Sequence, residues 1–203
     1  MMKIGFMRVA ASQLVFAVAL AAAAPGTIPA QTAILEMDPA ETRVEFTLGD
    51  VLHTVHGAFV LKRGNFRFDA ATGKASGELV VDAASGDSGS AARDRRMHAN
   101  VLESARYPEI VFRPDRVEGK LEPQGVSKVQ LHGMFAIHGA EHEITVPAEV
   151  EADGGRYNAT VQFAVPYVKW GMKNPSTLFL RVNDRVDITI HTVARLSHDR
   201  NSN

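Results

Sequence analysis

The sequence predicts an all-β protein with one short helix, built as an antiparallel barrel of about eight strands. Apolar and polar side chains alternate with the period of two that is typical of strands with one wet face, most clearly at residues 42–48, 129–137, 144–150, 157–165 and 186–190. Turn motifs separate such runs at residues 69–73, 122–125 and 153–155, and strands joined by short turns are antiparallel. A barrel is favoured over a sandwich because closure removes exposed strand edges.

A helix is predicted over residues 91–103, which contain good helix formers and no strand alternation. The apolar residues Met97, Val101 and Leu102 recur there at helical spacing, and Ser90 is placed to act as the N-cap. We expect about three turns lying across the side or end of the barrel.

Residues 166–182 form the second exception to strand alternation. They contain Gly171, Pro175 and Trp170, the only tryptophan, and they predict a long loop with a short strand around residues 178–181. Long structured loops in compact domains often carry function.

The N-terminal residues have the order of a secretory signal peptide. Lys3 and Arg8 precede a run of apolar and small residues at 9–24, which passes into Pro and Gly before it is long enough to span a bilayer. We expect residues 1–30 to be a cleaved leader, residues 31–203 to form a single domain, and the product to be exported to the periplasm.

Composition excludes several classes of partner. The formal charge is −1, and loss of the leader's Lys3 and Arg8 would lower it by two to −3, so no electrostatic footprint for nucleic acid is expected. No apolar run after residue 30 is long enough for stable membrane insertion. The sequence has no cysteine, so packing and strand pairing alone must stabilise the fold. The sequence does not decide the oligomeric state, and a homodimer is one alternative.

Catalytic motifs are sparse, although the chain has eight histidines. One alternative is a metal-dependent or acid/base enzyme that uses His53, His138, His142 and Asp94. Asp94 follows Arg93, and the simpler interpretation is that it caps the start of the helix or forms an ion pair there. Nucleophile-elbow and phosphate-loop motifs are missing, so we expect no catalytic residues, no metal and no cofactor.

The apolar strand faces are the stronger lead, because a closed sheet of about eight strands can be filled by side chains or can hold one apolar ligand. Pattern alone favours the filled interior. A packed β domain that acts as an interaction module therefore stays open as a further alternative.

The chain resembles the exported YceI-like family of polyisoprenoid-binding proteins. The resemblance runs in order from about Leu35 to Leu196, and it is carried by the following segments: Asp38 with residues 42–46 (TRVEF), residues 53–57 (HTVHG) with Phe59, residues 64–69 (GNFRFD), Arg93-Asp94 with His98 and Leu102, residues 107–112 (YPEIVF), and residues 133–139 (GMFAIHG) with 144–147 (ITVP). Phe135 stands where this family usually has leucine.

This resemblance implies an extended lipocalin-like antiparallel barrel with an apolar tunnel. The tunnel would bind the tail of an isoprenoid lipid, such as a polyprenyl lipid or an isoprenoid quinone, for transport or storage and without catalysis. Burial of an alkenyl tail stabilises the complex by roughly 0.8 kcal/mol per CH₂. The expected lining residues are Val44, Phe46, Phe59, Leu131, Phe135, Ile144, Val146, Val161, Phe163 and Ile188. The expected mouth residues are Tyr167, Trp170 and Met172.

Overall fold

The fold was analysed in a computed structural model that describes residues 32–49, 53–177 and 181–197. Its strands are β1 (Thr32–Met37), β2 (Arg43–Gly49), β3 (Thr54–Asp69), β4 (Ala75–Asp87), β5 (Glu109–Glu118), β6 (Gly125–Ile137), β7 (Ala140–Asp153), β8 (Arg156–Val165) and β9 (Val186–Ser197). The helical elements are the 3₁₀ turn η1 (Pro39–Glu41), the helix α1 (Ala91–Arg96) and the π-helical turn η2 (Met97–Val101). The predicted leader at residues 1–30 lies outside the described residues.

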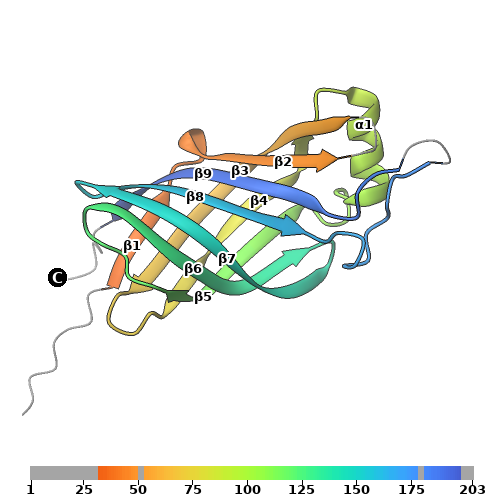
Figure 1. Cartoon of the computed structure of the whole chain (residues 1–203). Helices are drawn as coiled ribbons and strands as arrows, with labels where there is room; N and C mark the ends of the chain where they lie inside the picture. Colours follow the sequence, from red (N-terminus) through yellow and green to blue (C-terminus); the bar gives the residue numbers. More distant parts are fainter. Residues whose placement is uncertain (1–31, 50–52, 178–180, 198–203) are drawn as a thin grey trace, which may run out of the picture.

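The strands form a closed antiparallel barrel (Figure 1). β1 and β2 each pair with both β3 and β9, so these two short strands occupy one position in succession. The nine strands of the described chain thus fill eight barrel positions, and the pairing of β3 with β4 closes the ring. The predicted all-β barrel of about eight strands with one short helix is confirmed.

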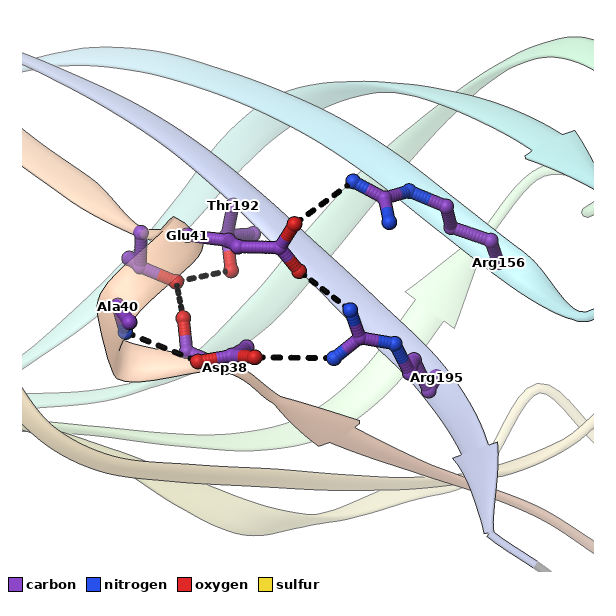
Figure 2. A network of polar contacts seen from close by, with 7 residues as sticks. Asp38, Ala40, Glu41, Arg156, Thr192 and Arg195 are labelled. Atoms are coloured by element: carbon purple, nitrogen blue, oxygen red, sulfur yellow. Dashed lines mark hydrogen bonds and ion pairs between the residues drawn. The ribbon is translucent and has the colours of Figure 1, made fainter.

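A network of polar contacts stabilises the 3₁₀ turn η1, which separates β1 from β2 (Figure 2). The Asp38 carboxylate accepts a hydrogen bond from the Ala40 amide at 2.9 Å and so caps η1. The Thr42 hydroxyl donates to the Asp38 carbonyl oxygen at 2.7 Å and lies 2.8 Å from the Thr192 hydroxyl on β9. Arg195 forms ion pairs with Asp38 and Glu41 on the surface. Figure 2 shows Arg156 paired with the other carboxylate oxygen of Glu41.

The helix was predicted in the right place and begins at the predicted residue, but its predicted end and its predicted cap were wrong. α1 begins at Ala91, yet the Ser90 side chain makes no capping hydrogen bond. The Asp94 carboxylate instead reaches back to the amide and hydroxyl of Ser88. The helix ends at Val101 within η2 rather than at Glu103, because Glu103 has a φ of 47°, which no helix can continue.

The predicted turns at residues 69–73, 122–125 and 153–155 all join consecutive strands. Residues 166–177 form turns and irregular backbone, as expected of the predicted loop. The predicted strand at residues 178–181 lies mostly outside the described residues, and Arg181 itself is not in a strand. Figure 1 shows α1 and the loop between β8 and β9 together at one end of the barrel, opposite β1.

Candidate ligand-binding cavity

The barrel interior contains two apolar cavities that meet. The larger, which we call the outer chamber, has a volume of about 430 Å³, within the range of small-molecule binding sites. Its walls come from β2, β3, β4, β5, β6, β8 and β9, from α1 and η2, and from the loop after β8. The smaller, the inner cavity, has a volume of about 120 Å³ and lies among residues of all nine strands.

The two cavities share the five wall residues Val44, Val81, Ile110, Phe135 and Phe163. Phe135 of β6 and Phe163 of β8 pack edge to face, with 5.9 Å between ring centroids. These shared residues mark where the wide chamber narrows, so a long ligand would have to pass the two phenylalanines to enter the inner cavity.

The structure brings the ten expected lining residues together on the inner face of the barrel. Four of them line the inner cavity only: Leu131, Ile144, Val146 and Val161. Three line the outer chamber only: Phe46, Phe59 and Ile188. The other three, Val44, Phe135 and Phe163, line both. Nine of the ten lie on strands whose inward side the period of two had indicated, and Phe59 on β3 came from the resemblance.

Two of the three expected mouth residues lie in the wall of the outer chamber. Met172 and Tyr167 are both buried and both line it. The Tyr167 hydroxyl donates to the Asn183 carbonyl oxygen at 2.6 Å, so it fixes the loop rather than facing the cavity. Burial raises the pKa of this phenol to about 12.

Trp170, the third expected mouth residue, lines neither cavity. Its indole stacks on the His142 imidazole, with 4.0 Å between ring centroids, and lies 5.8 Å from the Phe135 ring. Trp170 therefore packs behind a wall residue at the helix end of the barrel. A single tryptophan in a loop gives no sequence signal that separates a position at the mouth from a position packed behind the wall.

The two charged wall residues of the outer chamber were not foreseen. Arg93 and Arg96 of α1 line it, together with Ser88 and Ser90, and the other wall side chains within the described chain carry no charge. Residues three apart on a helix share a face, so this spacing could have placed both arginines beside Met97.

The candidate residues for an enzyme do not form one site. His53 precedes β3 and is exposed. His138 lies in the β6–β7 turn, 4.8 Å from the Tyr107 ring and 3.4 Å from a Glu103 carboxylate oxygen. Within the described residues, no group of three or more His, Cys, Asp or Glu side chains could hold a metal ion.

His142 and Asp94 also have contacts of their own. His142 is stacked on Trp170, and its Nε2 atom is buried without a hydrogen-bond partner, as is that of His138. Burial lowers the pKa of His142, which favours a neutral ring. The hydrogen bond from the Ser88 hydroxyl holds the pKa of Asp94 below its usual value, so this carboxylate is a charged anchor for Ser88.

No helix in residues 32–49, 53–177 or 181–197 is long and apolar enough to cross a membrane.

The fold and its cavity define the class of the protein: a lipocalin-like closed antiparallel barrel with an apolar interior that widens towards one end. The chain belongs to the YceI-like family, because the YceI-like domain model matches residues 35–194. A search of the curated proteins found no match.

Solved structures agree on the fold. Burkholderia cenocepacia BcnA is 20% identical with a TM-score of 0.64, and the match covers 77% of this chain and 98% of that one. A polyisoprenoid-binding domain from Saccharophagus degradans, implicated in plant cell wall breakdown, is 12% identical with a TM-score of 0.63 and coverages of 80% and 98%. The Campylobacter jejuni YceI protein is 16% identical with a TM-score of 0.51 and coverages of 70% and 82%.

Proposed function

We propose that this protein binds a single isoprenoid lipid inside the barrel and carries or stores it without catalysing a reaction. The observation that carries the proposal is the outer chamber of about 430 Å³, with apolar strand walls, which continues past Phe135 and Phe163 into the inner cavity. Apolar surface of this extent gains free energy when a hydrocarbon tail covers it.

The dimensions suit a chain-like ligand. Residues 129–137 of β6 contribute inward side chains to both cavities. With the usual rise and tilt of barrel strands, they span on the order of 20 Å along the barrel axis. An isoprenoid tail of several units matches such a long, narrow and apolar space, and a compact ligand does not. The polyisoprenoid-binding domain among the structural relatives supports the same ligand class.

A cavity-filling variant tests this function directly. Ile188 lines the outer chamber from β9, and the next residue, Thr189, points to the other side of the strand. Native mass spectrometry of the mildly purified protein should show a bound isoprenoid. Ile188→Trp should lose this lipid, whereas Thr189→Trp should keep it. Absence of lipid from the wild-type protein, with no uptake of added polyprenol or quinone, would reject the proposal.

We further propose that the protein works in the periplasm after removal of residues 1–30. The leader-like order of Lys3, Arg8 and the following apolar run supports export. The mature protein should begin at Gln31 and should be released with the periplasmic fraction. Recovery of residues 1–24 in the membrane fraction would contradict this.

A further inference from the structure

We propose that the helix end of the barrel is a docking surface for an anionic lipid bilayer. The inference rests on the proposed lipid-binding function and adds the partner surface with which the protein exchanges its lipid. The docking surface belongs to what we call the cover: the segment between β4 and β5 (residues 88–108) and the described part of the segment between β8 and β9 (residues 166–177 and 181–185). Figure 1 shows α1 and the β8–β9 loop together at this end.

Charge is divided unevenly between the cover and the rest of the barrel. The cover contains eight Lys and Arg side chains and three Asp and Glu side chains. The remaining described residues contain 11 Lys and Arg side chains and 18 Asp and Glu side chains. The cover is therefore strongly positive and the remainder strongly negative, although the formal charge of the whole chain is only −1.

The protein leaves the positive charge of the cover largely unneutralised. Within the described residues, only Arg185 among the cations of the cover forms an ion pair, with Asp184 at 3.8 Å. The other two acidic residues of the cover, Asp94 and Glu103, are only partly exposed. All eight cations are exposed: Arg93, Arg95, Arg96, Arg106, Lys169, Lys173, Arg181 and Arg185.

Cations elsewhere on the barrel are mostly neutralised by the protein itself. In the rest of the described chain, eight of the 11 form ion pairs with carboxylates, namely Lys62, Arg63, Arg113, Arg116, Lys120, Lys128, Arg156 and Arg195. The fields of paired charges largely cancel at a distance, whereas those of unpaired like charges add. The positive field that a partner would meet is therefore concentrated on the cover.

An anionic bilayer is the partner that this distribution fits. Lys and Arg side chains near an anionic lipid surface strengthen binding, and the acidic remainder of the barrel is repelled by it, so the cover would face the lipid. The cover also encloses the outer chamber, so this orientation places the proposed lipid site beside the bilayer. An isoprenoid exchanged there avoids the unfavourable transfer of its apolar tail through water.

The docking would be electrostatic rather than a hydrophobic insertion. The large hydrophobic side chains that are exposed in the described residues, Val60 of β3 and Val126 of β6, lie outside the cover. Binding should therefore be reversible and should weaken as salt screens the charges.

Cosedimentation with vesicles tests the docking surface, using phosphatidylglycerol and phosphatidylcholine in equal parts or phosphatidylcholine alone. At low salt the wild type should bind the anionic vesicles roughly tenfold or more tightly than the neutral ones, and added salt should shrink this preference. The triple variant Arg95→Gln, Lys169→Gln and Lys173→Gln should lose roughly tenfold or more in affinity for the anionic vesicles. None of these three residues lines either cavity, so native mass spectrometry without vesicles should show the isoprenoid still bound.

The matched control is the triple variant Arg43→Gln, Arg67→Gln and Lys74→Gln. These three side chains are also exposed, line neither cavity and form no ion pair within the described chain, and their loss lowers the net charge by the same amount. The control should stay within about threefold of the wild type.

Equal losses in the two triple variants, or equal binding of the wild type to both kinds of vesicle, would overturn the docking surface. Tighter binding to polyglutamate than to the anionic vesicles would also overturn it, in favour of an acidic polypeptide as partner. A wild type that binds the anionic vesicles but neither contains nor takes up an isoprenoid would keep the docking surface and reject the proposed function.

Discussion

The inner cavity and the outer chamber are enclosed by the same barrel but differ in what surrounds them. Around the inner cavity, inward side chains from all nine strands approach one another and leave about 120 Å³. Around the outer chamber, a short helix and a loop cover the barrel end and leave about 430 Å³. Packed strands therefore stabilise the fold around the inner cavity, whereas the helix and the loop enclose the volume of the outer chamber that can bind a ligand.

Burial agrees with this division. The inner region contains a cluster of tightly buried residues that includes Leu35, Phe68 and Val146. At the outer end, many members of the corresponding cluster are only partly buried, among them Met97, Val101 and Ile188. A loosely packed wall gives up some dispersion energy, and a ligand that enters the chamber would restore those contacts.

The largest difference in stability is expected when the same carboxylate is placed either in the inner cavity or in the outer chamber. Val146 lines the inner cavity and is 5% exposed, whereas Val55 is half-buried in the wall of the outer chamber. Val146→Asp should lower the free energy of unfolding by about 3–5 kcal/mol, because it leaves an unpaired carboxylate in an apolar interior. Val55→Asp should cost under about 1 kcal/mol, since water reaches that position. Urea unfolding of both variants measures the difference, and equal losses would refute it.

A smaller effect is expected for Trp170→Ala, which removes the ring stacked on His142. We expect a loss of about 2–3 kcal/mol in the free energy of unfolding, less than for a fully buried aromatic residue. Lys169→Ala, at the exposed neighbouring position, should stay within about 0.5 kcal/mol of the wild type. A stable Trp170→Ala variant that no longer binds lipid would instead support the position at the mouth that the sequence suggested.

Sequence reasoning was strongest wherever a local rule decides the outcome. A period of two indicated the inward face of β2, β6, β7, β8 and β9, and turn chemistry placed three of the connections between consecutive strands. The shared barrel position of β1 and β2 could not be read in this way, because it depends on which distant strands pair with both segments. The volume of the interior was equally out of reach, since alternation describes a packed core and a cavity alike.

The mouth was harder to predict than the walls. Arg93 was interpreted only as a partner of Asp94, but the structure bonds both side chains to Ser88 and leaves the Arg93 edge beside the chamber. Trp170 was placed by its aromatic character, and its true partner, His142, lies on a strand 28 positions away in the sequence, a distance that no local pattern bridges.

Phe135→Leu should weaken the boundary between the two cavities. The shorter side chain loses the edge contact with Phe163 and part of the contact with Trp170, so we expect a cost of about 1–1.5 kcal/mol. The variant should also accept longer prenyl tails than the wild type, as shown by native mass spectrometry with polyprenols of graded length. Phe112→Leu is the control, because Phe112 is paired with Phe135 but lines only the inner cavity. A matching shift in the control would show that Phe135 is no boundary.

The smallest effect should come from an ion-paired histidine on the outside of the barrel. His132 of β6 lies beside the inward-facing Leu131, with its two ring nitrogens 2.6 Å from Asp115 and 2.9 Å from Glu143. The hydrogen bond to Asp115 raises the pKa of His132 above its usual value, so the folded state holds this proton more tightly than the unfolded chain does. The carboxylates are exposed, and solvent screening keeps the stabilisation small.

The sign of the pH dependence follows from that raised pKa. The stabilisation should be fully present below the unfolded-state pKa of His132, provided that the two carboxylates stay ionised, and it should be lost as the pH rises through the folded-state pKa. His132→Gln should therefore be less stable than the wild type near pH 5.5, and the two unfolding curves should converge at alkaline pH. His142, whose pKa is lowered, contributes in the opposite direction, but it is present in both proteins and cancels in their difference. His191→Gln is the control, because this exposed ring contacts the Thr160 hydroxyl rather than a carboxylate. Two outcomes would show that the ion-paired histidine does not stabilise this wall of the barrel. One is a stability difference between His191→Gln and the wild type that depends on pH in the same way, and the other is a stability difference between His132→Gln and the wild type that grows as the pH rises.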